Sequence, residues 1–225
     1  MERARREGVL ITLEGVEGAG KSTQMTRLAA WLAGLGVPVV PTSEPDGSPL
    51  GPWVRRALAE RSPLDPLTEC FLFATARAEH VRRVIRPALD RGAVVLCDRY
   101  ADSTVAYQGY GRGVPVEVIA ELNRLATDGL TPDLTLVLDL DPADGLRRAR
   151  GRQVTLSSAP AGDLEPDPFE RLGLDFHERV RKGYRAIHER EPERVVLVDA
   201  ASGEAAVAAA IRAIVRSRLR IGEPA

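Results

Sequence analysis

The segment Gly15–Ser22 reads Gly-Val-Glu-Gly-Ala-Gly-Lys-Ser and fills every fixed position of the phosphate-loop pattern G-x-x-x-x-G-K-S/T. An apolar run at residues 9–13 precedes it and a helical pattern at 23–35 follows it, which is the setting of a functional phosphate loop. The glycines let backbone N–H groups point toward phosphate oxygens, and the next helix adds its positive N-terminal end. Lys21 has the reach to contact the β- and γ-phosphates. We therefore assign nucleoside triphosphate binding to Gly15, Val16, Glu17, Gly18, Ala19, Gly20, Lys21, Ser22 and Thr23.

Size, composition and charge limit the classes of protein to which the chain can belong. Its 225 residues suffice for one sizeable core and are few for two. Hydrophobic residues at 44% and charged residues at 28% are ordinary for a globular protein. A formal net charge of -1 gives no general attraction to nucleic acid, so we expect no nucleic-acid partner. The sequence holds no run of about 18 apolar residues, so we expect no membrane-spanning segment.

The cysteines and the N-terminus indicate the compartment. Cys70 and Cys97 lie in apolar segments and are expected to be buried, reduced thiols. The first eight residues are charged and lack the apolar core of a signal peptide. We therefore expect a cytoplasmic protein with a flexible arm at 1–8, a single domain at 9–220 and a C-terminal tail at 221–225.

Five apolar runs of β type recur along the chain, with helical patterns between them. They lie at residues 9–13, 37–40, 93–97, 134–140 and 195–198. Continuous rather than alternating apolar strands are typical of a sheet that is covered on both faces. The alternation of strands and helices then predicts an α/β fold with a parallel, five-stranded, doubly wound sheet. Such folds bind ligands at the carboxyl ends of their strands, which is where the phosphate loop begins.

Two further segments are unusual. A long helix is predicted over residues 67–91, and Pro87 near its end predicts a kink or a break. Residues 153–168 are rich in Ser, Ala, Gly, Pro and Asp and show no periodicity, which suits either a mobile lid or a disordered insert. We place the lid at residues 150–170.

Motifs that are missing from the sequence narrow the type of phosphate-loop protein. Guanine-nucleotide switches need an Asn-Lys-x-Asp motif, whereas the single asparagine, Asn123, lies in Asn-Arg-Leu-Ala. Large remodelling ATPases normally need a longer chain. The remaining class is a compact kinase that phosphorylates a small acceptor.

Three motifs resemble those of the thymidylate kinases and follow the order of that family over residues 8–200. They read Glu44-Pro-Asp-Gly47, Phe71-Leu-Phe-Ala-Thr-Ala-Arg-Ala-Glu-His80 and Asp98-Arg-Tyr-Ala-Asp-Ser-Thr-Val-Ala-Tyr-Gln-Gly109. The resemblance implies a fold of the nucleoside-monophosphate-kinase type and a homodimer. It also implies Mg²⁺-dependent transfer of the γ-phosphoryl group from ATP to dTMP.

Recognition of a pyrimidine requires a flat aromatic side chain and hydrogen-bond donors. Phe73 and Arg77 lie four residues apart, so one helix face presents both. The resemblance implies that Phe73 stacks on thymine and that Arg77 donates to an exocyclic oxygen, and we assign Phe71 to packing. The alternative is that both phenylalanines are core residues.

Asp98 and Arg99 follow the third apolar run and are expected in the ligand crevice. A carboxylate there can hold Mg²⁺ through water, and an arginine can hold the acceptor phosphate. Ser22 and Asp98 are therefore the predicted metal ligands. By resemblance, Arg99 bridges the donor and acceptor phosphates. A structural ion pair is the alternative for an isolated Asp-Arg dipeptide.

The resemblance alone assigns the next contacts of the acceptor. It implies that Thr104 and Gln108 contact the base, and that Tyr107 packs under the sugar and disfavours a 2′-hydroxyl group. A polar helical turn without a ligand is the alternative.

Two charged residues complete the predicted acceptor site. The resemblance implies that Glu17 faces the 3′-hydroxyl of the acceptor sugar and Arg99, whereas a solvent-facing carboxylate is the alternative. Arg55 lies at a suitable distance after the Glu-Pro motif to hold the acceptor phosphate, although a surface arginine fits its position nearly as well.

Phosphoryl transfer is helped by an arginine over the γ-phosphate. Some thymidylate kinases carry this arginine in the phosphate loop, where this chain has Gly18. The resemblance therefore implies that the arginine comes from the lid. The predicted catalytic set is Lys21, Arg99, Glu17, Arg150 and Arg152.

The chain departs from the family pattern at three positions. Pro168 stands where a lid arginine is usual, so either Arg152 or Arg171 takes over or closure of the lid differs. Ser43 and Asp46 replace an arginine and a glycine of the acceptor-side loop. Two other functions therefore stay open: a kinase of another deoxynucleotide, and a catalytically weak nucleotide-binding regulator.

Overall fold

The computed structural model describes residues 8–59, 64–157 and 168–219, without the side chains of residues 152–168. Its centre is a sheet of five parallel strands in the order β2-β3-β1-β4-β5. The strands are β1 (Val9–Glu14), β2 (Val39–Ser43), β3 (Val94–Asp98), β4 (Leu134–Asp139) and β5 (Val195–Asp199). The predicted five-stranded parallel α/β sheet is confirmed.

Burial on both faces explains the continuous apolar runs. Leu10, Ile11 and Leu13 of β1 expose none of their surface, and most residues of β3 and β4 are buried as well. Consecutive strand residues point to opposite faces, so their joint burial means that both faces are covered. Cys70 and Cys97 are buried and unpaired, as predicted.

Strand β2 lies further along the chain than predicted. The apolar run at 37–40 placed it too early, because pairing with β3 continues through the polar residues that follow. β2 is the edge of the sheet, where Pro41 is tolerated because one side of the strand needs no N–H partner. The longer strand brings Ser43 and the following Glu44 to the carboxyl edge of the sheet.

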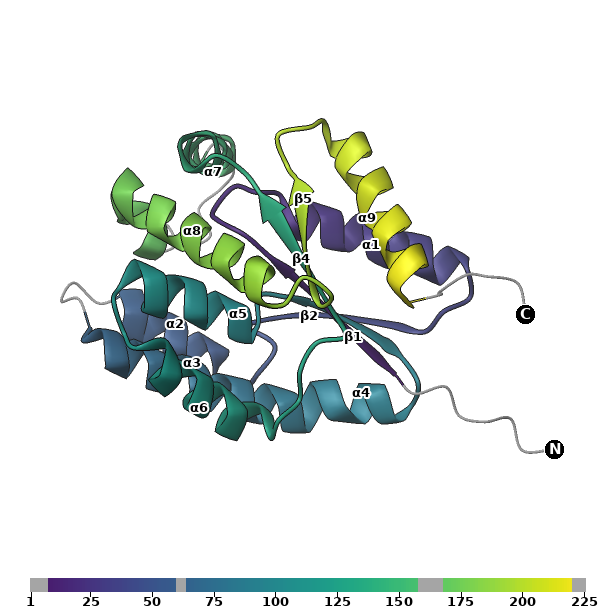
Figure 1. Cartoon of the computed structure of the whole chain (residues 1–225), viewed down its shortest axis with the longest axis horizontal. Helices are drawn as coiled ribbons and strands as arrows, with labels where there is room; N and C mark the ends of the chain where they lie inside the picture. Colours follow the sequence, from purple (N-terminus) through teal and green to yellow (C-terminus); the bar gives the residue numbers. More distant parts are fainter. Residues whose placement is uncertain (1–7, 60–63, 158–167, 220–225) are drawn as a thin grey trace.

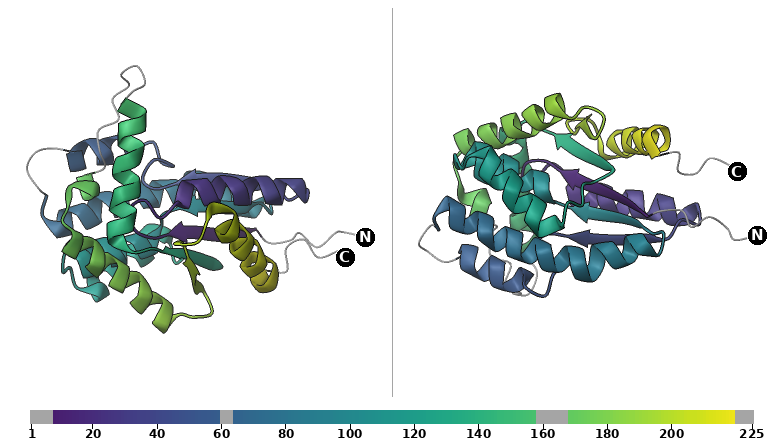
Figure 2. Two further views of the ribbon diagram at one scale, coloured as in Figure 1. Left: turned by 90° about the horizontal axis from the view of Figure 1, so that it is seen from above. Right: turned by 60° about the horizontal axis from the view of Figure 1, so that its bottom comes forward.

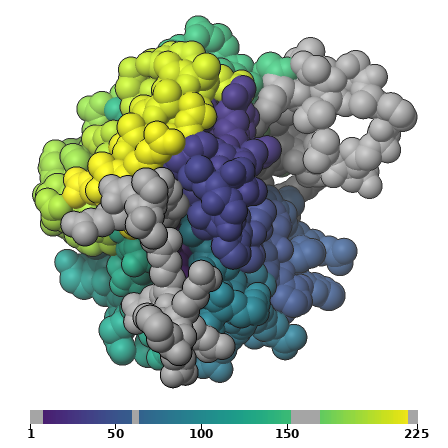
Figure 3. All heavy atoms as spheres, turned by 90° about the vertical axis from the view of Figure 1, so that its right-hand side faces the viewer, coloured from purple at the N-terminus to yellow at the C-terminus, as the bar shows by residue number. Residues whose placement is uncertain are grey.

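Helices cover both faces of the sheet (Figure 1). On one face α1 (Lys21–Gly34) packs against α9 (Glu204–Leu219), and Figure 3 shows the two side by side in dark purple and yellow. Six further helices lie on the other side: α2 (Gly51–Ala59), α3 (Pro66–His80), α4 (Arg86–Asp90), α5 (Ala101–Thr104), α6 (Val116–Thr127) and α8 (Leu174–Arg190).

The long helix predicted over residues 67–91 is present but interrupted. Between α3 and α4 lies a π-helical stretch at Val81–Ile85. Pro87 has no N–H group to donate to the preceding turn, which accounts for the irregular hydrogen bonding just before it. The chain stays helical through Pro87 to Asp90, so the expected irregularity takes the form of a π-helical stretch and not of a break. A second π-helical stretch, Val105–Gly111, continues α5 and packs against α8.

Helix α7 (Pro142–Ser157) contacts α8 and projects from the body of the molecule in Figure 2. It includes residues 153–157, so the expectation of irregular structure from residue 153 onward is wrong for these residues. The rest of the predicted lid insert, 158–165, lies outside the described residues, as do arm residues 1–7 and the tail 221–225. Among the helices that are described, none is long and apolar enough to cross a membrane.

Candidate active site

A cavity of about 290 Å³ lies at the carboxyl ends of β1, β2 and β3. This is the crevice in which an open α/β sheet binds its ligands. The phosphate loop and the predicted phosphate ligands Arg55 and Arg99 meet in it. Its lining residues are Glu17, Gly18, Gly20, Lys21, Ser22, Met25, Ser43, Glu44, Asp46, Arg55, Asp98, Arg99 and Glu170.

The phosphate loop depends on glycine for its shape. Gly15 and Gly20 have φ values of 137° and 95°, which residues with side chains rarely adopt. Gly18 packs against Gly145 of α7, and a Cβ atom on Gly18 would lie 2.0 Å from the Gly145 carbonyl oxygen. An arginine at this loop position would thus require α7 to move.

Lys21, the first residue of α1, folds back onto the loop. Its ammonium donates to the carbonyl oxygens of Gly15 at 3.0 Å and Val16 at 3.1 Å. Burial and the positive charge of Arg99 lower the pKa of Lys21 to about 8. A polyphosphate on the loop would favour the protonated form, so phosphate binding is expected to be coupled to proton uptake by Lys21.

Glu17 is buried within the loop, and three side chains converge on its carboxylate. Oε1 accepts hydrogen bonds from Tyr107 Oη at 2.5 Å and from Arg99 Nη2 at 3.0 Å. Oε2 lies 2.9 Å from Nδ1 of His177. Burial alone would raise the pKa of Glu17, but the adjacent His177 and the charges of Arg99 and Lys21 lower it to about 2. Glu17 is therefore an ionised carboxylate that faces the cavity.

Arg99 leaves β3 in a left-handed conformation with a φ of 67°. This conformation is uncommon for a residue with a side chain and is found at functional sites. Its guanidinium lies 4.8 Å over the ring of Tyr107, and its side chain is 22% exposed. The arginine is thus fixed between the phosphate loop and residues 101–111, with part of its cation open to the cavity.

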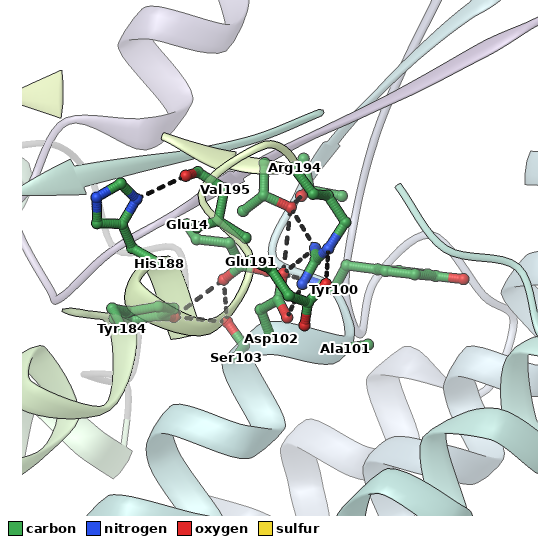
Figure 4. Close-up of polar contacts among 12 residues, drawn as sticks. Glu14, Tyr100, Ala101, Asp102, Ser103, Tyr184, His188, Glu191, Arg194 and Val195 are labelled. Carbon is green, nitrogen blue, oxygen red and sulfur yellow. Dashed lines mark hydrogen bonds and ion pairs between the residues drawn. The ribbon is translucent and has the colours of Figure 1, made fainter. Parts of the chain in front are cut away.

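A buried carboxylate beneath the site supports this turn (Figure 4). Glu14 accepts hydrogen bonds from the Tyr100 N–H at 2.8 Å, the Ser103 hydroxyl at 2.6 Å and the Tyr184 hydroxyl at 2.9 Å. Burial raises the pKa of Glu14 to about 7. Because Tyr100 follows Arg99 directly, the Glu14 contacts hold the backbone that carries Arg99.

An ion pair next to Glu14 fixes the start of α5. Arg194 Nη1 donates to the Asp102 carboxylate at 2.7 Å and to the Thr135 hydroxyl at 2.9 Å (Figure 4). The pair joins α5 to β4 and to the start of β5.

The two predicted metal ligands lie next to each other. The Ser22 hydroxyl donates to the Asp98 carboxylate at 2.9 Å. A hydroxyl and a carboxylate are hard oxygen donors, and Mg²⁺ is usually held by one or two carboxylates together with substrate phosphates. The pair fits this ion in the presence of a nucleotide. Within the described part of the chain, no group of three or more His, Cys, Asp or Glu side chains forms a ligand set by itself.

Arg77, predicted to contact the base, is buried and bonded to other protein groups. Its guanidinium donates to Glu44 at 2.8 Å, to Asn123 Oδ1 at 2.7 Å and to Thr104 Oγ1 at 3.1 Å. The structure therefore brings Arg77 and Thr104 together, behind the Glu44 that lines the cavity. Their contacts to a base stay predictions.

The two phenylalanines of α3 point in different directions, as expected for residues two apart on a helix. Phe73 is partly buried, with its ring 6.3 Å from that of Phe169. The prediction that Phe71 packs in the core is wrong, because this residue is 52% exposed. The helix periodicity separated the two rings but did not reveal which face α3 turns to the core.

Tyr107 and Gln108 are both buried on the segment after α5. Tyr107 contacts Glu17, and its place under the acceptor sugar stays a prediction. The Gln108 amide donates to Glu69 of α3 at 3.1 Å. Its predicted contact to the base is not tested by this arrangement.

Arg55 of α2 reaches the cavity, and its Nε donates to Asp46 at 2.6 Å. Asp46 is one of the residues that depart from the family pattern. The departure thus has a local partner, since the carboxylate orients the arginine predicted to hold the acceptor phosphate.

The described arginine side chains of α7 do not line the cavity. Arg148 donates to the Ala200 carbonyl oxygen at 3.2 Å, and Arg150 is exposed. The side chain of Arg152 lies outside the described residues. Arg171, the other candidate for the lid arginine, is exposed after α7. The identity of the lid arginine is therefore still a prediction.

Our sequence reasoning did not find Glu14, His177 or Tyr184. Glu14 carries a detectable signal, because it is a carboxylate at the end of an otherwise apolar run. His177 and Tyr184 belong to an amphipathic helix, whose pattern does not distinguish them from other core residues. Packing of α8 on Val105–Gly111 brings them to the site.

Comparisons with known proteins agree with this geometry. The family model described as thymidylate kinase matches residues 13–211. A thymidylate kinase from Solidesulfovibrio magneticus is 50% identical over 92% of this chain and 98% of its own length. One from Deinococcus radiodurans is 46% identical over 94% of this chain and 98% of its own. The crystal structure of thymidylate kinase from Ehrlichia chaffeensis superposes with a TM-score of 0.72 at 32% identity, covering 92% and 98% of the two chains. The chain belongs to the thymidylate kinase family.

Proposed function

We propose that this member of the thymidylate kinase family is an ATP-dependent nucleoside monophosphate kinase that converts dTMP to dTDP. One observation carries the proposal: a complete phosphate loop and Arg99, whose guanidinium donates to Glu17 of that loop, line a single cavity together with Arg55. A triphosphate on the loop and a monophosphate at Arg99 would share this cavity. That arrangement is what direct phosphoryl transfer between two nucleotides needs.

On the donor side, the backbone N–H groups of the loop and Lys21 bind the phosphates of ATP. Ser22 and Asp98 would hold Mg²⁺, with the fit argued from their oxygen donors and their 2.9 Å contact. When bound, the ion neutralises charge on the β- and γ-phosphates.

On the acceptor side, Arg99 holds the phosphate of dTMP next to the γ-phosphate, and Arg55 adds a second cation. The ionised Glu17 accepts a hydrogen bond from the 3′-hydroxyl of the sugar. Tyr107 packs beside the sugar and leaves no room for a 2′-hydroxyl group. In this proposal the contacts to the acceptor begin at the cavity and continue toward the buried side of Val105–Gly111, the segment after α5.

The base lies against Phe73 in this proposal. Arg77, Thr104 and Gln108 supply polar contacts to its edge, which requires Arg77 and Gln108 to exchange a protein partner for the base. In such an exchange the carbonyl groups of thymine accept in place of protein oxygens, so the donors of Arg77 and Gln108 stay paired.

The lid supplies the arginine that stabilises charge on the transferred group. Arg150 and Arg152 are the candidates, since Gly18 cannot hold a side chain without a shift of α7. We infer that a rearrangement of α7 accompanies nucleotide binding, because Arg150 is exposed and outside the cavity.

We further propose a cytoplasmic homodimer. Leu67 and Phe71 of α3 and Val118 and Leu125 of α6 are exposed apolar residues. The two helices pack side by side, as Figures 1 and 2 show. Exposed apolar residues gathered on adjacent helices are typical of a protein–protein interface.

The test of the function is ADP release with ATP, Mg²⁺ and one of dTMP, dUMP, dCMP, dGMP or AMP. We expect turnover of dTMP to exceed that of every other monophosphate. Preferential turnover of another deoxynucleotide would show that Phe73, Arg77 and Thr104 are misassigned. ATP binding without turnover of any acceptor would favour the nucleotide-binding regulator.

A further inference from the structure

His177 of α8 is fully buried between two parts of the candidate site. On one side its Nε2 lies 3.1 Å from the carbonyl oxygen of Phe169. On the other its Nδ1 lies 2.9 Å from Oε2 of Glu17 in the phosphate loop. The ring of Phe176 meets the imidazole edge-on, with 5.2 Å between centroids. A histidine outside the motifs of the sequence thus links the loop to a segment more than 150 residues away.

The two oxygens of the Glu17 carboxylate have separate partners. Oε1 is held by Tyr107 and Arg99 on the acceptor side of the cavity. Oε2 and His177 Nδ1 are close to each other, yet their directions do not form an aligned hydrogen bond, and neither atom bonds another described group. Oε1 of Glu17 thus has two partners of its own, whereas the orientation of Oε2 depends on His177.

The chemistry of the two partners defines the hydrogens on the ring. A backbone carbonyl only accepts hydrogen bonds, so Nε2 carries a hydrogen. The ionised carboxylate of Glu17 also only accepts, so a hydrogen on Nδ1 makes that contact attractive. A hydrogen on each ring nitrogen therefore complements both partners of His177. Contacts of this kind are often poorly aligned without substrate and become tighter in the complex.

We propose that His177 is a positioning residue that orients the Glu17 carboxylate toward the acceptor nucleotide. The proposal rests on the role of Glu17 given under the proposed function. His177 does not touch the cavity itself, so its effect passes through Glu17. When both carboxylate oxygens are held, Glu17 keeps one orientation. Binding of the acceptor then avoids the entropic cost of ordering a free carboxylate.

Two substitutions separate the two ends of the ring. In His177→Asn the amide reaches the position of Nδ1 and keeps a donor for Glu17, whereas in His177→Gln it reaches the position of Nε2 and keeps a donor for Phe169. We expect His177→Gln to raise KM for dTMP about tenfold to a hundredfold, with a smaller change in KM for ATP. We expect the KM for dTMP of His177→Asn to stay close to that of the unsubstituted protein. His188 lies on the same helix as His177 and contacts the Val195 carbonyl oxygen. Its variant His188→Asn provides the control.

A purely structural role makes a different prediction. It would lower the thermal midpoint in both variants and change both KM values together, and that result would overturn the proposal. If His177→Gln does not fold, His177→Asn decides alone: a KM for dTMP near that of the unchanged chain supports the proposal, and a raised KM contradicts it.

The variant Glu17→Gln separates this proposal from the role of Glu17. Because His177 acts through Glu17, adding His177→Gln to Glu17→Gln should have little further effect on KM for dTMP. Additive effects would refute the coupling. If Glu17→Gln raises KM while His177→Gln does not, the proposal for His177 fails and the role of Glu17 stands. If Glu17→Gln itself leaves KM unchanged, both fail.

Discussion

The guanidinium of Arg99 donates to the carboxylate of Glu17 at 3.0 Å, and this contact joins the end of β3 to the phosphate loop. Two elements that are separate in the sequence thereby become one wall of the cavity. The arginine is the cation that the proposed mechanism places between the two nucleotides.

Replacement of this arginine tests that role. We expect Arg99→Ala to lower kcat by about 100- to 1000-fold, because a fixed cation that stabilises charge in the transition state is lost. Steady-state kinetics measure the loss, and circular dichroism checks that the fold is kept. Arg147, which is exposed and paired with Asp144 on α7, provides the control Arg147→Ala. Near-normal turnover of Arg99→Ala would remove Arg99 from the catalytic set.

Glu14 is expected to make stability depend on pH. Its pKa is about 7 in the folded chain, against an ordinary value of 4.5. The folded state thus binds the proton more tightly, so this contribution to stability is complete below pH 4.5 and is lost as the pH rises through about 7. The whole effect is on the order of 3 kcal/mol.

The variant Glu14→Gln removes the titration and keeps the shape of the side chain. We expect the free energy of unfolding of the unchanged chain to fall between pH 5 and 8 relative to that of the variant, as measured by urea unfolding at a series of pH values. Parallel pH profiles for the two proteins would contradict the raised pKa of Glu14.

Ser22 and Asp98 are expected to set the requirement for Mg²⁺. Ser22→Ala removes an oxygen ligand and Asp98→Asn removes the negative charge of the other ligand, so the Mg²⁺ concentration for half-maximal activity should rise about tenfold or more. A Mg²⁺ titration of ADP release measures this change. Thr75→Ala, which removes an exposed hydroxyl bonded within α3, is the control. An unchanged Mg²⁺ requirement in both site variants would exclude these ligands.

Arg150 is expected to act on the transition state. Arg150→Ala should lower kcat at least about tenfold and leave both KM values nearly unchanged, because the arginine stabilises charge that develops during transfer. Arg147→Ala on the same helix should be neutral. If the two variants behave alike, Arg150 is not the lid arginine and Arg152 is the next residue to replace.

Phe71 is expected to lie in the interface of the homodimer. Phe71→Glu places a charge in the apolar surface of α3 and α6, and should weaken dimerisation at least about tenfold. Sedimentation velocity over a range of protein concentrations measures the change. Leu35→Glu replaces an exposed apolar residue outside this surface and is the control. The proposed interface would be contradicted if the unsubstituted protein sedimented as a monomer. It would also be contradicted if Phe71→Glu dimerised as strongly as the unsubstituted protein.

Local patterns were sufficient to predict the fold class and to place the phosphate loop between a strand and a helix. The phosphate loop is contiguous, so its glycine spacing, Lys21 and Ser22 are fixed by neighbouring residues in the sequence. The short apolar runs, separated by helical patterns, indicate a sheet buried on both faces, because consecutive residues of a strand point to opposite faces. Asp98 and Arg99 line the cavity where the sequence led us to expect them, because the pair directly follows the apolar run at residues 93–97.

Long-range packing decided the rest. Tyr184 meets Glu14 across 170 positions of the sequence, and Arg77 meets Glu44 across 33, so no local pattern contains these contacts. The exposure of Phe71 depends on which face of α3 the neighbouring helices cover, and the extent of β2 depends on pairing with β3. The sequence by itself therefore determined the parallel α/β fold and the phosphate loop, through propensities that act between neighbours. Only the tertiary structure decided which buried groups support Glu17 and Arg99, because their burial and charge arise when distant helices pack on the sheet.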